Sequence, residues 1–512
     1  MFFPAELKMN DTFLVTHQIS ALRFSIGGLL SPISIRDQMV RAKMFVDRAI
    51  DEHLISARRG LFVVGAGAAG VTAAMYAASM GFPVTLIDRR ERPFHLQREC
   101  HTRWIDPTQY DWPASHWNEG IFPWDSNMWD AEAAPLRWAA DLAYNVAAGW
   151  HQELDLAVQD YKGILEYLPL MKYIGTDDPA PGHELKVLFR NIVDGENELS
   201  IAEEREVCPG FDSEALTGEK PLLTRQCGAL LDARGFPREK VQCGSYRSFA
   251  FWDSDPFEQR TFELNIVQQR LRVLICGSGD GALQDFLRIS TGMSSAAAIM
   301  ATLEPLIDQV DKHLLRRIYS EEDQLYRAKI WSGKKYDHHC LLRMDFQHKI
   351  WTNEILASTI GAEIRQKISG LLNYSSNIDL ELVHTCDHFT AHYPLNRFLV
   401  HLISTVDKDR IAIRNRGGKI DIRPRLALSK ISCVDHTCES PRECLGKPHA
   451  VDFEPLGDCC SQEEKDKDDT SQLVRADYDV VILRLGLEHY DSIESTRPLQ
   501  FHRHLLPYHP PL

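Results

Sequence analysis

The chain has few of the features that suit a nucleic-acid or membrane partner. Its 57 lysine and arginine residues are outnumbered by 72 aspartate and glutamate residues, which gives a formal net charge of −15. That balance argues against a general nucleic-acid surface and against binding to anionic membranes. No run is apolar and long enough for a membrane span, the most apolar stretch being the segment 61–81. We therefore expect no nucleic-acid partner and no membrane partner.

Cysteine pairs of diagnostic spacing are also lacking. The 12 cysteines are widely spread and include no Cys-x-x-Cys, so neither a disulfide framework nor a redox-active pair is indicated. The first residues lack a basic segment followed by an apolar core, which predicts no secretory signal. We accordingly expect reduced cysteines and a cytoplasmic setting.

Metal-binding patterns are weak. In the Cys/His-rich stretch 433–460, four residues separate Cys433 from Cys438 and five separate Cys438 from Cys444, which is marginal for zinc. Whether this stretch binds zinc stays open, and we expect no metal site. If the run 337–340, Asp-His-His-Cys, is helical, its two adjacent histidines point in different directions and suit one metal ion poorly. His384, His388 and His392 are spaced four residues apart, so on a helix they could bind a metal or serve as acid/base groups. We favour the interpretation that they belong to a polar segment before a helix.

Residues 61–88 carry the strongest signal. An apolar strand enters a Gly-x-Gly-x-x-Gly turn made by Gly65, Gly67 and Gly70, a helix rich in small residues follows, and a second strand ends at Asp88. Gly65 permits the tight turn, Gly67 lets the backbone approach a pyrophosphate, and Gly70 lets the helix lie close to the strand. Asp88 follows Gly65 by 23 residues and suits an adenosine ribose.

The start of the helix completes this expected dinucleotide site. Ala68 and Ala69 lie between the second and third glycines, where free backbone N–H groups and the positive end of the helix dipole attract a pyrophosphate. The stretch resembles the N-terminal ADP-binding motif of the large flavoprotein families. That resemblance implies that FAD binds here.

The residues after Asp88 leave two choices open. Arg89 could pair with a 2′-phosphate, which would suit NADP, or it could be a solvated arginine, which we prefer. A long aromatic loop then contains five tryptophans between residues 104 and 129. It could be a wall of the flavin or substrate pocket, with Gln97 as a polar candidate, or a hydrophobic cluster that holds the loop down.

A second strand–glycine–helix pattern occurs at residues 271–287. Gly277, Gly279 and Ala282 fit Gly-x-Gly-x-x-Ala, a form used for NAD(P) in flavoproteins with two dinucleotide domains. With Gly281 the same turn also resembles that of S-adenosylmethionine methyltransferases and polyamine synthases. No acid ends a clear second strand about twenty residues later, so the cosubstrate of this turn stays open.

The strand predicted at 477–486 ends at Gly486. It resembles the late strand of flavoproteins that re-enters the first sheet and ends beside the flavin, with Arg484 facing the cofactor or substrate. This resemblance predicts a discontinuous first domain.

We expect an α/β, Rossmann-like FAD/NAD(P)-binding fold with a discontinuous first domain, a second nucleotide-binding lobe and a helical insertion. Residues 1–57 form an N-terminal extension with an amphipathic helix at 34–55 and no clear element before residue 34. Residues 58–170 and 365–495 form the FAD domain, 171–300 the second lobe and 301–364 the insertion. Residues 410–423 are expected to form a β-hairpin.

This organisation favours an FAD-dependent oxidoreductase reduced by NAD(P)H and acting on a small-molecule substrate. No catalytic residue can be assigned, and the oligomeric state is not indicated. One alternative is a transferase that binds an adenosine-containing cosubstrate at Gly277–Gly281. Another is a non-catalytic dinucleotide-sensing protein.

Overall fold

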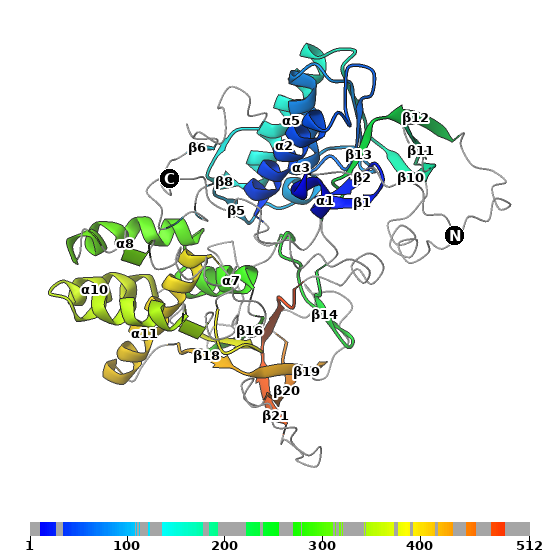
Figure 1. The fold of residues 1–512 in the computed structure, drawn as a ribbon. Helices are drawn as coiled ribbons and strands as arrows, with labels where there is room; N and C mark the ends of the chain where they lie inside the picture. Colours follow the sequence, from blue (N-terminus) through cyan, green and yellow to red (C-terminus); the bar gives the residue numbers. More distant parts are fainter. Residues whose placement is uncertain are drawn as a thin grey trace.

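The computed structural model describes the following parts of the chain: residues 11–26, 34–107, 109, 112, 121–122, 136–177, 184–192, 222–235, 239–254, 270–277, 279–310, 313, 317–318, 320, 342–343, 345–372, 377–389, 393–414, 418–433, 447–456 and 473–486. These residues form two α/β units, drawn in blue to green and in green to red-orange in Figure 1.

The first unit is built on a six-stranded sheet. From edge to edge its strands are β1 (Gln18–Ser20), β2 (Arg23–Ser25), β13 (Ala229–Asp232), β3 (Leu61–Val64), β4 (Val84–Ile87) and β9 (Leu165–Leu168). All neighbours are parallel except β1 and β2. Every residue of β3 and β4 is buried, as expected for central parallel strands covered on both faces.

Helices and a small second sheet complete the first unit. The helices are α1 (Thr12–His17), α2 (Ile35–Asp51), α3 (Ala68–Ser79), α4 (His95–Arg98) and α5 (Ala143–Asp160). The antiparallel strands β10 (Met171–Asp177), β11 (Leu185–Asn191) and β12 (Leu223–Cys227) come between β9 and β13 in the chain. Short strand pairs join β5 (Trp104–Ile105) to β8 (Asp141–Leu142) and β6 (Ile121–Phe122) to β7 (Trp138–Ala139).

The second unit is built on a four-stranded parallel sheet. Its order is β18 (Ile420–Pro424), β17 (Ile378–His384), β16 (Leu271–Cys276) and β22 (Val480–Leu483). Its helices are α7 (Asp280–Thr291), α8 (Ala296–Val310), a helix over residues 345–357, α10 (Gly361–Leu372) and α11 (Pro394–Arg414). The antiparallel strands β19 (Leu426–Cys433), β20 (His449–Pro455) and β21 (Val474–Tyr478) come before β22.

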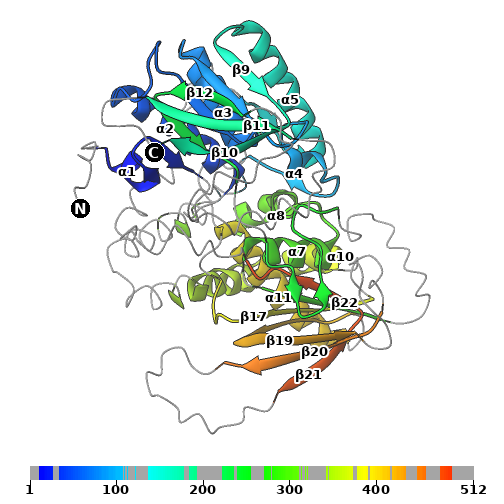
Figure 2. The same cartoon turned by 90° about the vertical axis from the view of Figure 1, so that its right-hand side faces the viewer.

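Strand β16 shows how this sheet separates two cores. Val273 and Ile275 belong to the cluster shared with the helices, whereas Leu274 and Cys276 belong to the cluster shared with β19–β21. Successive side chains point to opposite faces of a strand. Helices therefore cover one face of the sheet and the antiparallel strands cover the other, as Figure 2 also shows.

The two units have the same chain order. From β3 in the first unit and from β16 in the second, a strand leads into a glycine turn and a helix, two parallel strands and three antiparallel strands follow, and a last strand returns beside the first one. This arrangement confirms the Rossmann-like α/β fold and the presence of a second lobe of the same plan. Nucleotide binding by the second lobe stays a prediction. A short hairpin, β14 (Gln242–Cys243) and β15 (Tyr246–Arg247), lies between the units in the chain.

The pairing of β22 corrects one expectation. This strand pairs with β16 of the second sheet, not with the first sheet, so the strands at 378–483 do not belong to a discontinuous first domain. The returning strand of the first sheet is β13, which pairs with β3. Strands β10–β13 likewise complete the first unit and were wrongly placed in the second lobe. Strands β13 and β22 are both buried and apolar, so only their pairing shows which sheet each of them joins.

Among the other local predictions, one is confirmed and two are wrong. The amphipathic helix is confirmed as α2, which is capped by Ser34 and buries Met39, Ala42, Val46 and Ala49 in the first core. The segment before it does contain elements, α1, β1 and β2. The expected hairpin at 410–423 is wrong in its first strand, because residues 410–414 continue α11.

The cysteines were not all as expected. Cys433 at the end of β19 is disulfide-bonded, which contradicts a fully reduced set and removes its thiolate as a zinc ligand. Five other described cysteines are free, namely Cys100, Cys227, Cys243, Cys276 and Cys386. Residues 434–446 of the Cys/His-rich stretch lie outside the described residues.

Within the described part of the chain, no single helix is long and apolar enough to cross a membrane; one bent pair, α7 with α8, passes that test by length and composition.

Of the two described tryptophans of the aromatic loop, Trp104 is exposed and Trp112 is a packing residue, as are Trp138 and Trp150 beyond the loop. Trp112 is 1% exposed and lies in the core of the second unit, where its ring stacks on Phe398 of α11 with centroids 5.1 Å apart. Trp138 and Trp150 meet edge to face in the first core. Trp117, Trp124 and Trp129 lie outside the described residues. The loop thus carries a side chain from the first unit into the second.

Replacing Trp112 with alanine should therefore lower the free energy of unfolding by about 3–5 kcal/mol, the usual cost of emptying a buried aromatic site. Urea unfolding followed by circular dichroism would measure it. Trp104→Ala is the matched control, because Trp104 is 39% exposed and its loss should cost about 1 kcal/mol or less. A Trp112→Ala protein of normal stability but altered turnover would instead support the pocket-wall reading.

Candidate functional site

The first glycine turn has the geometry of a phosphate cradle. Gly65 has φ +107°, and a Cβ there would lie 2.6 Å from the carbonyl oxygen of Ala233 on the neighbouring segment. A Cβ on Gly70 would lie 1.9 Å from the carbonyl oxygen of Gly65. A Cβ on Gly67, by contrast, would meet nothing within 4 Å. Two glycines are thus required by the fold, while the middle one leaves open space beside the backbone.

Helix α3 begins at this open glycine. Gly67 is its N-cap and supplies no side-chain hydrogen bond, and Ala68 and Ala69 are its first residues. The leading N–H groups of a helix carry partial positive charge and have no partner within the helix. The turn therefore offers a pyrophosphate a helix terminus that no side chain caps.

Asp88 holds this turn in place. Its carboxylate accepts a hydrogen bond of 2.6 Å from the N–H of Ala66 and one of 2.7 Å from the N–H of Arg90. Burial raises the pKa of Asp88, although the two N–H groups act in the opposite direction. A carboxylate has acceptor sites beyond these two bonds. Asp88 can thus order the glycine turn and still accept from a ribose hydroxyl.

The other candidates near this turn are less directly placed. Arg89 is exposed, which agrees with a solvated arginine. Gln97 is buried on α4. The residue before that helix, Phe94, donates its N–H to the carbonyl oxygen of Ala66 at 2.9 Å, so α4 lies against the turn. A role of either side chain toward a cofactor stays a prediction.

The second glycine turn repeats the open middle position. Gly277 has φ +146°, and a Cβ there would lie 2.1 Å from the carbonyl oxygen of Arg484. Gly279 is the N-cap of α7, makes no side-chain cap, and would place a Cβ in open space. A Cβ on Gly281, however, would lie 3.1 Å from the ring of Phe251 and 3.5 Å from Cδ of Arg484. Part of this turn is therefore covered by protein.

A carboxylate lies in the first turn of α7. Asp280 accepts hydrogen bonds from the side-chain amide of Asn396, at 2.7 Å, and from the N–H of Tyr393, at 3.1 Å. Burial raises the pKa of Asp280 to about 6, although these donors and Arg397 act in the opposite direction. Asp280 thereby ties the second glycine turn to the start of α11.

The strand register gives His384 a position that its sequence pattern did not indicate. The N–H of Gly65 bonds to the carbonyl oxygen of Ile87, one residue before Asp88, and the N–H of Gly277 bonds to that of Val383, one residue before His384. His384 therefore takes the place of Asp88 in the second unit. An acid was expected about twenty residues after Gly277, but the helices from α8 to α10 come before the second strand, and His384 follows Gly277 by 107 residues.

Gly486 follows β22 and has φ +86°. Its carbonyl oxygen accepts a hydrogen bond of 2.8 Å from the N–H of Lys240 in the segment that links the units. Because β22 belongs to the second sheet, Gly486 lies beyond the end of the second sheet. The expectation that it follows a strand of the first sheet was wrong.

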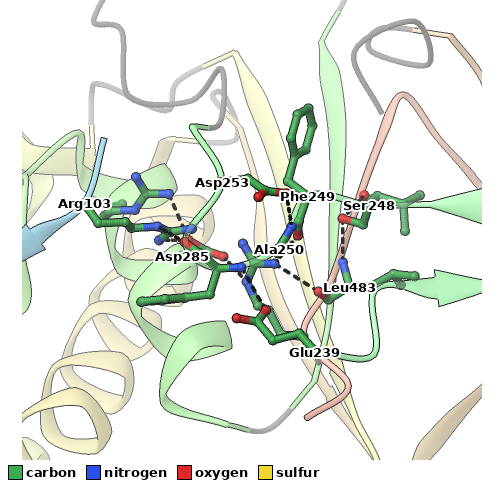
Figure 3. A network of polar contacts seen from close by, with 12 residues as sticks. Arg103, Glu239, Ser248, Phe249, Ala250, Asp253, Asp285 and Leu483 are labelled. Atoms are coloured by element: carbon green, nitrogen blue, oxygen red, sulfur yellow. Dashed lines mark hydrogen bonds and ion pairs between the residues drawn. The ribbon is translucent and has the colours of Figure 1, made fainter. Parts of the chain in front are cut away.

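A buried ionic cluster connects the two units, and Figure 3 shows part of it. Asp285 of α7 accepts from Arg103 of the first unit at 2.5 Å, from Arg288 at 2.8 Å and from Arg484 at 2.8 Å. Its side chain is 1% exposed. Burial alone would raise the pKa of Asp285, but the three guanidinium groups hold it well below its usual range.

The linking segment 239–254 is bound to the same cluster. Arg484 donates to the carbonyl oxygen of Phe249 at 2.5 Å, and Arg103 donates to that of Phe251 at 2.8 Å. The ring of Phe251 lies 4.2 Å from the guanidinium carbon of Arg103. The backbone N–H of Phe251 donates to the carboxylate of Glu239 at 2.8 Å. Arg484 thus contacts both the linking segment and the second glycine turn.

The described residues contain no group of three or more His, Cys, Asp or Glu side chains arranged to hold a metal ion. His384 and His388 lie at the end of β17 and just after it, whereas His392 and the run 337–340 lie outside the described residues.

A family model covers the first glycine turn. Residues 63–131 match the NAD(P)-binding Rossmann-like domain. The match includes Gly65, Gly67, Gly70 and Asp88, so this part of the chain is a nucleotide-binding domain of Rossmann type. No curated protein matches the chain.

Solved structures of low identity resemble the fold. Thioredoxin reductase from Lactococcus lactis is 10% identical with a TM-score of 0.34, and covers 84% of this chain and 78% of its own. Bacillithiol disulfide reductase from Staphylococcus aureus is 9% identical with a TM-score of 0.36, covering 84% and 77%. The FAD-bound cadaverine monooxygenase DfoA from Erwinia amylovora is 8% identical with a TM-score of 0.38, covering 87% and 81%. Values at this level carry no argument about the reaction.

The ionic cluster generates a stability prediction. Asp285→Asn leaves three guanidinium groups buried beside a neutral amide, and should lower the free energy of unfolding by about 3–5 kcal/mol. Glu166→Gln is the control, because its ion pair with Arg225 is exposed and should be worth about 1 kcal/mol or less. Equal losses in the two variants would contradict the importance of the cluster.

The pH dependence of this loss has a definite sign. The pKa of Asp285 is lower in the folded state, so its stabilisation is complete above the unfolded pKa of about 3.9 and is lost as the pH falls. The difference in stability between wild type and Asp285→Asn should be constant from about pH 5 to 8. It should shrink only below about pH 4, as chemical denaturation at several pH values would show.

Proposed function

We propose that the protein is an FAD-dependent oxidoreductase whose flavin is reduced by NAD(P)H. The observation that carries this proposal is the repetition of one site plan. Each unit places an open glycine, Gly67 or Gly279, at the start of a helix that no side chain caps. Two such turns in one chain suit two dinucleotides, and a flavin paired with a nicotinamide is a combination that can pass electrons on to a substrate.

FAD is assigned to the first unit, where all parts of the expected site are present. The open face at Gly67 receives the pyrophosphate, the start of α3 at Ala68 and Ala69 supplies N–H groups, and Asp88 is placed for the ribose. When bound, the flavin supplies the electron-transfer chemistry. The chain binds and orients it, and the substrate remains unassigned.

NAD(P)H is assigned to the second unit, through Gly277, Gly279 and Gly281. Gly279 leaves space for a phosphate, while Phe251 and Arg484 cover Gly281. The covering side chains come from the linking segment and from the end of β22. Entry of a dinucleotide therefore requires Phe251 to move away from the turn, and the ring is only partly buried.

The covered turn also favours a second candidate. If Phe251 and Arg484 remain on Gly281, the second turn serves packing, and the protein is a non-catalytic sensor with one dinucleotide. A transferase that uses Gly277–Gly281 gains no support from a described residue. Reduction of bound flavin by NAD(P)H distinguishes the oxidoreductase from the sensor.

The first turn provides a matched pair of variants. Gly67→Val places two methyl groups in open space, so it should give folded protein that retains less than about a tenth of the wild-type flavin, a loss of more than about 1.4 kcal/mol of binding free energy. The flavin-to-protein ratio after dialysis is the measurement. Gly70→Val forces a side chain against the carbonyl oxygen of Gly65 and should unfold the unit. A Gly67→Val protein with a full complement of FAD would overturn the assignment.

The second turn is tested in the same way. Gly279→Val should leave the flavin content unchanged and slow reduction by NAD(P)H by at least about tenfold, because the side chain occupies the space intended for phosphate. Stopped-flow absorbance of the flavin measures this rate, and reduction by dithionite controls for flavin access. An unchanged rate would show that the second turn has only a packing role.

A further inference from the structure

We propose that the second nucleotide site selects a dinucleotide without a 2′-phosphate, so that the electron donor is NADH rather than NADPH, and that Asp387 is the residue that rejects the phosphate. This inference rests on the proposed function and concerns the carboxyl end of β17. In a parallel sheet of this type, the residue that ends the second strand faces the adenosine ribose.

Register places His384 at that position, where the first unit has Asp88. The imidazole is 3% exposed, and its Nδ1 atom has no hydrogen-bond partner in the described structure. Burial lowers the pKa of His384 to about 4, so the ring is neutral. A neutral imidazole can bond to a ribose hydroxyl, but it offers no charge to a 2′-phosphate.

Three cations described around this strand end each lie close to a carboxylate. Lys349 lies 3.1 Å from Asp345, which also accepts from His401 at 2.8 Å. Arg425, just after β18, lies 3.6 Å from Asp387. Arg423 donates to Glu381 at 2.8 Å. A 2′-phosphate would bring about two negative charges to a place where each of these cations already has a carboxylate beside it.

Asp387 is the acid best placed to act on the phosphate. It lies three residues beyond His384, past the carboxyl end of the strand, and its side chain is 11% exposed. A like charge in a partly buried site is repelled more strongly than in water. The same carboxylate also lies 3.6 Å from the guanidinium of Arg425, the kind of group that pairs with phosphates.

The test titrates NAD⁺ and NADP⁺ into the FAD-loaded, full-length protein and measures each dissociation constant by calorimetry. We expect NAD⁺ to bind at least about tenfold more tightly, which corresponds to about 1.4 kcal/mol. In Asp387→Asn the negative charge that repels a 2′-phosphate is removed, so NADP⁺ should gain about five- to tenfold while NAD⁺ changes little.

The control is Asp379→Asn, which removes the same charge at the other end of β17, where Asp379 accepts from the N–H of Lys419. It should leave the ratio of the two dissociation constants unchanged. Equal or tighter binding of NADP⁺ to the wild type would overturn the selectivity and leave the proposed function standing. Binding of neither nucleotide, with the flavin retained, would overturn both this inference and the second dinucleotide site.

Discussion

The carboxylate of Asp285 meets the guanidinium groups of Arg103, Arg288 and Arg484 in a place where its side chain is 1% exposed. A buried charge is costly unless it is paired, so each member of this cluster fixes the others. Arg103 comes from the first unit, Asp285 and Arg288 from α7, and Arg484 from the end of β22. Both units and the linking segment must therefore be in place before the charges are balanced.

Trp112 supports the same arrangement with apolar contact. Its ring comes from a loop of the first unit and stacks on Phe398 in the core of the second. The ionic cluster fixes how the paired groups are oriented, because guanidinium and carboxylate groups have preferred geometries. The tryptophan contributes buried apolar surface. Together they keep the second glycine turn beside the linking segment that partly covers it.

The two units share one backbone plan and differ in the side chains around it. Both contain a glycine turn, an uncapped helix start and a returning strand next to the first strand. They differ at the end of the second strand, where Asp88 in one unit is replaced by His384 in the other. They differ again beside the helix, where Phe251 and Arg484 approach Gly281. Such differences alter the charge and access of a site while the backbone plan is retained.

Local signals in the sequence determined the backbone of the first glycine turn almost completely. The three glycines, the small-residue helix and Asp88 lie within 28 residues, and each role depends on a neighbouring part of the chain, so spacing alone could predict them. Tertiary structure decided where β22 pairs, because a buried apolar strand does not specify its partner. It also decided that His384 ends the second strand of the second unit, since an insertion of helices separates it from Gly277. In the ionic cluster Asp285 bonds to Arg103, 182 positions before it, and to Arg484, 199 positions after it, and only folding brings such charges together.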